Sequence, residues 1–419
     1  MPSNSTRRGF LALCGASMTA GCSVPLFDGA VSLPVPTGAG DWPSSAGDAR
    51  RTHTNADADG PTGPVEPAWT ADGFGGKIAV STAENGVSRV YAFDRRNDAS
   101  RLAVLDGSGE VGWAVDHRGT EAVTLVDGVA VVPGLGPTLR AFADGSVAWS
   151  VDLGGSDTLA PPVATTAGVF ATTRSTDVYG VAPGDQRWHA APPRNRVPYD
   201  AVVAATDSVV LRGCIETVRL NAPSNPSRYH TTVDAYDPAT GDHLWNWGSP
   251  GFLYDLVVDG HALVAVAIPT GGREEGEPID RTPVLFALDT ENGLTMRRVR
   301  LDVPSLRSMA AGPDGLVLAT TGGVHAFDAS LERRWSARPD GEFLSLVRSS
   351  GTVYALRQGV DPIAASVVAF DAANGEERFT HDIDRRYGAV RAVVDDMLYI
   401  EGEDRGGADN RKLVALRDV

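Results

Sequence analysis

The sequence has very few lysines, and its charge is strongly one-sided. Only two of the 37 basic residues are lysines, and 53 acidic residues give the 419-residue chain a formal net charge of −16 at pH 7. Phosphate backbones repel so acidic a protein, so we expect no sequence-independent nucleic-acid binding. A carboxylate-rich surface also suits a high-salt medium, in which dense counterions screen the repulsion between acidic side chains.

Long apolar runs are also missing. No segment reaches the roughly 18 uninterrupted apolar residues that a membrane-spanning helix requires. The hydrophobic fraction of 42% is nevertheless that of a chain that folds around a core. The 47 glycines and 27 prolines favour many short strands joined by turns over long helices.

Cysteine is scarce, which limits disulfide bonding. Two of the three cysteines, Cys14 and Cys22, lie near the N-terminus, and Cys214 stands alone in the strand-like run 209–215. If the N-terminal segment is removed or modified, no intramolecular disulfide can form. We therefore interpret Cys214 as a small buried apolar residue, not as a nucleophile.

The first 22 residues have the features of an export signal and are excluded from the fold argument. The stretch around Arg7 and Arg8 (Thr-Arg-Arg-Gly-Phe-Leu) resembles the twin-arginine export motif, and a short apolar stretch follows it. The sequence Thr-Ala-Gly-Cys ending at Cys22 resembles a lipobox, whose cysteine receives a lipid. The resemblance implies export and a diacylglyceryl anchor at Cys22 on the outer face of the cytoplasmic membrane.

Two regions follow the predicted signal peptide at 1–22. Residues 23–40 are rich in Gly, Pro, Ser and Val, which is typical of a flexible tether. Residues 41–419 are dominated by an internal repeat, so we predict one domain across this whole range.

The repeat has a fixed order of residue types. A small residue is followed by Asp two positions later, Gly six later and a large aromatic residue ten later, with shortened turns in some copies. The small-residue positions are Val104, Ala141, Gly180, Ala235, Ala287, Ala326, Ala369 and Ala415. The aromatic positions hold Trp113, Trp149, Trp188, Trp245, Trp335 and Phe379, and Trp69 is the predicted partner of the last copy. The mean spacing of about 44 residues is the length of a four-stranded propeller blade.

These observations predict an all-β, eight-bladed propeller of four-stranded antiparallel blades. In each unit, the Asp carboxylate accepts backbone N–H groups, Gly adopts a positive φ, and the aromatic ring fills the gap between neighbouring sheets. Pairing of the C-terminal strand with the strand of Trp69 closes the ring. A seven-bladed ring is the alternative, if the copy at Gly180 or Ala326 is absorbed by its neighbour.

The pattern Ala-x-Asp-x-x-x-Gly-x-x-x-Trp resembles the pyrroloquinoline-quinone (PQQ)-type propeller repeat. That family includes quinoprotein alcohol dehydrogenases and also non-catalytic envelope lipoproteins, such as the propeller subunit of the β-barrel assembly machinery. Asp41-Trp42-Pro43 and residues 47–52 are similar to the family's pre-propeller segment, which lies against the ring. The resemblance is a strong indication of fold and a weak one of function.

The sequence offers no recognisable catalytic set. The dehydrogenases of the family hold their quinone with a vicinal Cys-Cys disulfide and Ca²⁺, and this chain has no adjacent cysteines. Its eight histidines are never closer than 13 residues, and Gly-x-Ser-x-Gly is absent. Residues 73–77 only superficially resemble a phosphate loop, and we interpret them as the turn into the first strand. We therefore predict no catalytic, cofactor-binding or metal-binding residue.

The leading functional hypothesis is a non-enzymatic, lipid-anchored propeller that binds a protein or small ligand through its rim or loops. One alternative is a PQQ- and Ca²⁺-dependent dehydrogenase, and another is a carbohydrate-binding module. Three insertions could bear on these hypotheses: 221–230 as a recognition loop, and 272–280 and 401–410 as acidic Ca²⁺ loops. Ordinary solvated loops are the favoured interpretation of all three.

Overall fold

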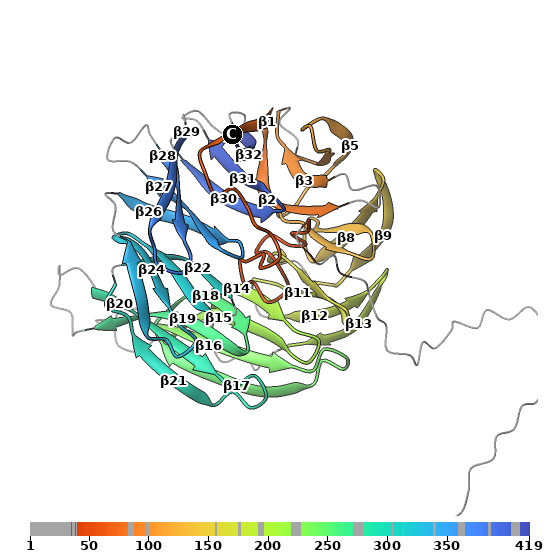
Figure 1. The fold of residues 1–419 in the computed structure, drawn as a ribbon. Helices are drawn as coiled ribbons and strands as arrows, with labels where there is room; N and C mark the ends of the chain where they lie inside the picture. The colour runs from red at the N-terminus through yellow and green to blue at the C-terminus, as the bar shows by residue number, and fades with distance from the viewer. Residues whose placement is uncertain are drawn as a thin grey trace, which may run out of the picture. The chain divides into compact units, whose positions relative to one another are not determined.

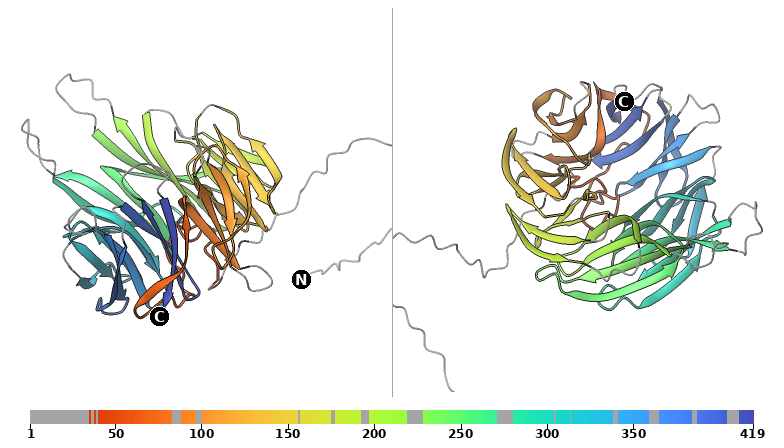
Figure 2. Two further views of the ribbon diagram at one scale, coloured as in Figure 1. Left: turned by 90° about the horizontal axis from the view of Figure 1, so that it is seen from above. Right: turned by 180° about the vertical axis from the view of Figure 1, so that it is seen from behind.

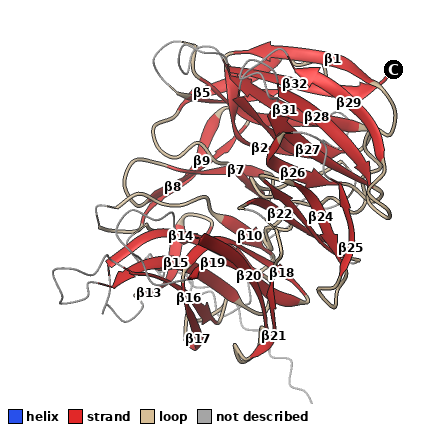
Figure 3. Ribbon diagram, turned by 90° about the vertical axis from the view of Figure 1, so that its left-hand side faces the viewer, coloured by secondary structure: helices blue, strands red, loops and turns tan. Residues whose placement is uncertain are grey.

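The computed structural model describes residues 35, 38, 40–82, 88–96, 100–155, 157–174, 177–191, 197–218, 228–270, 280–303, 305–312, 314–337, 341–358, 365–383, 387–403 and 411–419. All of them belong to the second of the two units into which the chain divides, residues 31–419. Their regular secondary structure consists entirely of β-strands, as predicted (Figure 3).

The 32 strands of the described residues form eight four-stranded antiparallel sheets, arranged around one axis as propeller blades (Figures 1 and 2). Blades 1 to 4 consist of β2 (Phe74–Thr82), β3 (Ser88–Asp94), β4 (Arg101–Leu105) and β5 (Val111–Asp116); β6 (Thr124–Val126), β7 (Val129–Pro133), β8 (Thr138–Ala143) and β9 (Ser146–Asp152); β10 (Val163–Thr165), β11 (Gly168–Thr172), β12 (Val178–Ala182) and β13 (Asp185–Ala190); β14 (Val197–Ala205), β15 (Val210–Val218), β16 (Arg228–Tyr236) and β17 (His243–Pro250). Blades 5 to 8 consist of β18 (Phe252–Asp259), β19 (His261–Thr270), β20 (Asp280–Leu288) and β21 (Thr295–Arg300); β22 (Leu306–Gly312), β23 (Gly315–Thr320), β24 (Gly323–Phe327) and β25 (Arg333–Ala337); β26 (Glu342–Arg348), β27 (Thr352–Gln358), β28 (Ala365–Asp371) and β29 (Glu377–Ile383); β30 (Tyr387–Val394), β31 (Met397–Glu403), β32 (Arg411–Asp418) and β1 (Val65–Asp72). In each blade the first strand given is innermost and the fourth is outermost.

The ring is closed by its two ends, as predicted. Strand β1 supplies the outermost strand of blade 8 and pairs with β32, with Trp69 opposite Ala415. The seven-bladed alternative is wrong, because the copies at Gly180 and Ala326 each form a complete hairpin in a sheet of their own. Closure removes the free sheet edges that an open array would expose.

The turn between the third and fourth strands of a blade, called the outer turn below, has the predicted local chemistry. In blade 4 the Asp237 carboxylate accepts the N–H groups of Ala239 and Thr240 at 2.8 and 2.9 Å. Gly241 adopts φ 75° and donates its N–H to the Asp237 carbonyl at 2.9 Å. A residue with a side chain adopts this left-handed conformation only at a cost, which explains the glycine.

The hydrophobic core lies between the blades. For example, one buried cluster joins Val178 of blade 3 to Val210 of blade 4, and another joins Leu285 of blade 5 to Leu318 of blade 6. A single blade buries only one face against each neighbour, so the stability of the fold depends on the completed ring.

Candidate functional site

The outermost strands carry the indoles that join neighbouring blades. Each indole stands opposite a small or β-branched residue of the third strand, and at six junctions it lies on the outer-turn glycine of the next blade. A Cβ atom added to those glycines would lie 2.5 to 3.6 Å from the ring. The pairs are Trp69 with Gly109, Trp113 with Gly145, Trp149 with Gly184, Trp188 with Gly241, Trp245 with Gly293 and Trp335 with Gly375.

Three of these indoles also form a hydrogen bond across the junction. The Nε1–H groups of Trp188, Trp245 and Trp335 donate to backbone carbonyls in the next outer turn at 3.0, 2.9 and 3.0 Å. The acceptor is always the residue directly after the turn aspartate: Pro238, Thr290 or Ala372. At the junction of blades 7 and 8, Phe379 takes the aromatic position and is 7% exposed.

Residues 41–60, called the channel segment below, run across the centre of the ring at one end of its axis (Figure 1). Their backbone bonds to the innermost strands or the turns after them in seven of the eight blades. The partners in those blades are Val80, Leu125, Ala205, Val258, Ala311, Arg348 and Asp395. The segment therefore joins the inner ends of the blades, as the resemblance to a pre-propeller segment implied.

Buried polar side chains fix the path of the channel segment. Arg51 adopts φ 62°, and its guanidinium donates to the Asp255 carboxylate at 3.0 Å. His53 follows with φ 52°, and burial lowers the pKa of its imidazole to about 4. The Asn55 amide donates to the carbonyls of Asp41 and Val393 at 3.0 and 3.2 Å. Arg51 and His53 can keep a positive φ because the surrounding hydrogen bonds hold the backbone in place.

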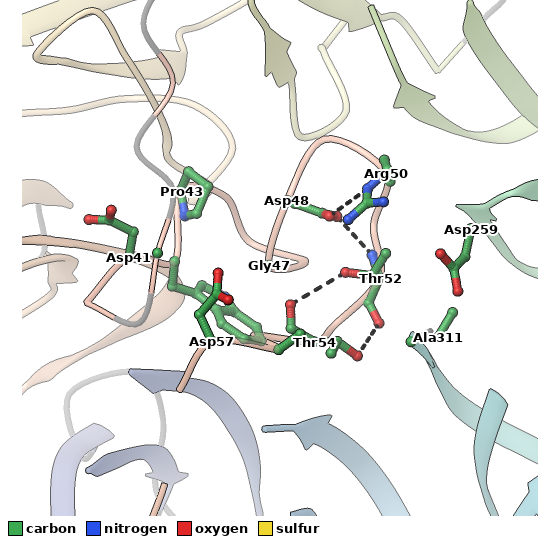
Figure 4. Close-up of a pocket in the computed structure, with 14 residues that line it drawn as sticks. Asp41, Pro43, Gly47, Asp48, Arg50, Thr52, Thr54, Asp57, Asp259 and Ala311 are labelled. Carbon is green, nitrogen blue, oxygen red and sulfur yellow. Dashed lines mark hydrogen bonds and ion pairs between the residues drawn. The ribbon is translucent and has the colours of Figure 1, made fainter. Parts of the chain in front are cut away.

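A pocket of about 330 Å³, called the channel-mouth pocket below, lies beside the segment (Figure 4). Asp41, Asp48, Asp57 and Asp259 contribute carboxylates to its lining, and Arg50 contributes a guanidinium. Asp48 is already engaged, because it accepts Arg50 Nε at 2.9 Å and the Thr52 N–H at 3.0 Å. Burial raises the pKa of both Asp41 and Asp259 above the ordinary range of a carboxyl.

These residues do not fit the quinone cofactor of the resembling dehydrogenases. Four carboxylates against one guanidinium among the lining residues disfavour a polycarboxylate quinone. Among the residues that the structure describes, no three His, Cys, Asp or Glu side chains are placed to hold a metal ion. The arrangement can instead accept a cationic or hydroxyl-rich group.

A second cavity, of about 480 Å³, lies between blades 5 and 6 and is called the 5/6 cleft below. One side is formed by Leu263, Ala287, Met296 and Arg297 of blade 5. The other side is formed by Leu316 of β23 and by residues 328, 329 and 331 of the outer turn of blade 6. Met296, which lines the cavity, is 60% exposed. The 5/6 cleft is thus a concave, partly apolar surface open to solvent.

The structure separates the sequence-predicted residues into two groups. The aromatic residues at the repeat positions lie in the outermost strands, as described above. Arg7, Arg8 and Cys22 lie outside the described residues, as do 221–227, 272–279 and 404–410 of the three insertions. Within the described residues, no helix is long and apolar enough to span a membrane.

Two smaller interpretations concern described residues. Cys214 is buried and unbonded to another cysteine, its sulfur lies 3.2 Å from Thr232 Oγ1, and burial raises the pKa of its thiol. Gly73, with φ 81°, connects β1 to β2, whereas residues 74–77 already belong to β2, so the interpretation as a turn holds for Gly73 alone.

Sequence reasoning missed both cavities. The channel-mouth pocket depends on contacts between distant segments, and no local pattern marks it. The 5/6 cleft did have a signal: in the copy at Ala287 the aromatic position holds Arg297, which is not aromatic.

Comparison with known proteins matches residues 229–397 to the family model described as outer membrane protein assembly factor BamB. No curated protein matches the chain. Similar solved structures include quinohemoprotein alcohol dehydrogenase from Comamonas testosteroni (TM-score 0.60, 13% identity, 90% of this chain and 80% of that one). BamB from Moraxella catarrhalis (0.50, 15%, 84% and 100%) and the computationally designed protein Ika8 (0.53, 14%, 86% and 98%) are also similar. Because one fold is shared by an enzyme, an assembly factor and a designed protein at such low identity, these structures show the fold alone.

Proposed function

We propose that this propeller, whose repeat is of the PQQ-like family, is a non-enzymatic scaffold that binds a protein partner outside the cytoplasm. The observation that carries the proposal is the 5/6 cleft, a concave surface whose lining includes the exposed Met296. Apolar surface that is exposed at a cleft of an otherwise acidic protein is typical of a binding surface.

The family match supports the same function. The model that matches residues 229–397 is described as an outer membrane protein assembly factor, and a factor that assembles proteins must bind them. The predicted leader would place the domain outside the cytoplasm, with a diacylglyceryl group at Cys22 as a sufficient anchor. For this chain we propose the outer face of the cytoplasmic membrane.

One set of experiments tests both the membrane anchor and the binding of a protein partner. Full-length protein should fractionate with membranes, and Cys22→Ser should release it in soluble form. Crosslinking of the anchored protein in its own cells, followed by capture, should recover one protein in stoichiometric amount. Recovery of no stoichiometric partner under repeated conditions, or membrane retention of the Cys22→Ser variant, would contradict the respective half of the proposal.

A PQQ-dependent dehydrogenase is the second candidate, because the fold is similar to that of a quinohemoprotein alcohol dehydrogenase. If PQQ and Ca²⁺ bind, their addition should raise the melting temperature and support dye-linked alcohol oxidation. The scaffold proposal predicts neither effect at saturating concentrations of both.

A further inference from the structure

The channel segment passes the blades in their order around the ring. Its first bonds to a blade join Trp42 and Val80 of blade 1 in both directions, at 2.8 and 2.9 Å. Its last backbone bond runs from the Gly60 N–H to the carbonyl of Asp395, in the turn after β30 of blade 8, at 2.7 Å. Between these ends, carbonyls of the segment accept N–H groups of blades 2, 4, 5, 6 and 7 at 2.7 to 3.0 Å: Pro43 from Leu125, Ala49 from Ala205, Arg50 from Val258, Thr52 from Ala311 and His53 from Arg348.

Most of these bonds lie on the inner edges of the sheets. The innermost strand of each blade pairs with another strand along one edge only. The other edge of such a strand has N–H and carbonyl groups that a second polypeptide stretch can bind through its own backbone. The channel segment supplies that stretch, and it does so for successive blades with one continuous piece of chain.

The junction of blades 8 and 1 is consequently joined twice. On the outside, β1 pairs with β32 of blade 8 and continues through Gly73 into β2 of blade 1, and we call this the outer closure. On the inside, the channel segment bonds to blade 1 through Trp42 and to blade 8 through Gly60. The Asn55 amide adds a bond to the Val393 carbonyl of blade 8 at 3.2 Å. We call these inner contacts the inner closure.

The inner closure is buried as well as bonded. Trp42 and Ala58 are 1% and 0% exposed, and both belong to the hydrophobic cluster that joins blades 7, 8 and 1. Asn55 is 7% exposed, and its side-chain oxygen accepts the N–H groups of Asp57 and Ala58, each at 3.2 Å. Separation of the segment from blade 8 would leave buried polar groups without partners, which is unfavourable.

We propose that the channel segment is a second closure of the ring, which holds blade 8 against blade 1 independently of the outer closure. The outer closure alone is open to fraying, because β1 is an outermost strand that pairs along one edge only. The inner closure keeps the two blades together while β1 opens and re-forms. This inference concerns the ring itself and holds with or without a protein partner.

The direct test measures how often blades 8 and 1 separate in full-length protein in detergent. Ala92 of blade 1 is 0% exposed and belongs to the cluster that joins blades 7, 8 and 1, so a thiol in Ala92→Cys reacts only when this junction opens. Mass spectrometry distinguishes its labelling from that of the three native cysteines.

Each closure is weakened by one substitution. Asn55→Ala removes the side-chain bonds of the inner closure and should raise the labelling rate of Ala92→Cys at least about fivefold. Trp69→Ala removes the indole of β1 from the outer closure and should raise it at least about tenfold. In the double variant the two factors should multiply, because the free energies of independent interactions add.

Two matched controls separate opening of this junction from other effects. Asp57→Ala changes an exposed side chain of the same segment and should leave the labelling rate unchanged. Ala171→Cys places a thiol in the second strand of blade 3, as Ala92→Cys does in blade 1, and Ala171 is 0% exposed in the cluster that joins blades 2 and 3. Its labelling reports general unfolding and should stay near the wild-type rate in both weakened variants.

A second measurement needs no substitution in the core. A protease site is inserted between Pro61 and Thr62, so that after cleavage only non-covalent contacts join residues 1–61 to the ring. We expect the N-terminal fragment to co-elute with the ring in size-exclusion chromatography. Cleavage at the same site placed after Ala30, before the channel segment, should release the shorter fragment.

Three results would overturn the inference. The first is a labelling rate of Ala92→Cys that Asn55→Ala does not raise, alone or together with Trp69→Ala. The second is an equal rise in the labelling of Ala171→Cys, which would mean general unfolding. The third is separation of the fragment cleaved after Pro61 from the ring in native buffer.

Discussion

On one side blade 5 receives the indole of Trp245 on its own Gly293, and on the other side it presents Arg297 to Leu331 of blade 6. The strand pairs behind these contacts are the same, since Ala235 and Ala287 occupy equivalent positions. Two substitutions thus replace an indole on a glycine by an arginine beside a buried leucine, since Leu331 is 5% exposed and belongs to the cluster that joins blades 5 and 6. The comparison teaches that a closed ring tolerates a junction without an indole, because an aliphatic cluster and the channel segment still join the two blades.

The largest expected effect on stability is the loss of an indole at a junction that has one, compared with the loss of Arg297 at the junction that has none. Trp335→Ala removes a ring that is 8% exposed and leaves a cavity against Gly375, so we expect a loss of about 3–5 kcal/mol in the free energy of unfolding. Arg297→Ala, at the equivalent position of blade 5, should cost less than about 0.5 kcal/mol. Urea unfolding of both variants checks the prediction, and equal losses would contradict it.

Lowering the pH should destabilise the fold through His53 of the channel segment. This effect does not involve either junction of blade 5. Burial holds the pKa of His53 at about 4, whereas the unfolded chain has the ordinary value of 6.5. Between these values the unfolded state binds more protons, so lowering the pH from 6.5 to 4 removes on the order of 2–3 kcal/mol of stability. His53→Asn should lose less stability than wild type between pH 7.5 and 4.5. A parallel loss in both proteins would mean that His53 is not the group responsible.

The outer-turn glycine can be tested independently of the indole. A Cβ at Gly293, with φ 72°, would lie 2.5 Å from the Trp245 ring. Gly128 has the same φ of 72° but nothing within 4 Å of the added atom. Both alanine substitutions incur backbone strain of about 1 kcal/mol, and Gly293→Ala should cost about 2 kcal/mol more. Thermal or urea unfolding measures the difference, and similar losses would show that the ring does not press on the glycine.

The smallest effect concerns the ion pair between Arg297 and Glu332 beside the 5/6 cleft. Glu332→Gln removes an exposed partner of Arg297 that lies 4.0 Å away, so stability should change by less than about 0.5 kcal/mol. Urea unfolding beside wild type measures the change, and a loss above about 1 kcal/mol would mean that the pair helps to hold blades 5 and 6 together.

Much of the fold could be predicted because its determinants recur locally. The spacing of Asp and Gly defines an outer turn, and the small residue opposite each indole follows from strand register, as Ala415 and Trp69 illustrate. The glycine that each indole contacts could not be predicted. For Trp188 it is Gly241, which belongs to the next blade and is 53 residues away in the sequence. The path of the channel segment could not be predicted either, because the segment bonds to the innermost strands, or the turns after them, of seven blades and no sequence repeat encodes these contacts.

The sites were less predictable than the fold. Arg297 breaks the repeat visibly, but only the structure shows that Leu331 is buried at this junction beside a cavity of about 480 Å³. Leu331 conceals a glycine position, because its left-handed φ of 60° is set by the turn and not by its residue type.

An exchange across the two sides of blade 5 tests the central claim most directly. Trp245→Arg removes the indole between blades 4 and 5, and Arg297→Trp with Leu331→Gly restores both the indole and its glycine between blades 5 and 6. In parallel urea unfolding, we predict that Trp245→Arg loses at least about 3 kcal/mol, whereas the double variant loses less than about 1 kcal/mol. Equal destabilisation by both variants, or a negligible effect of Trp245→Arg, would contradict the account of indoles as the residues that pack neighbouring blades together.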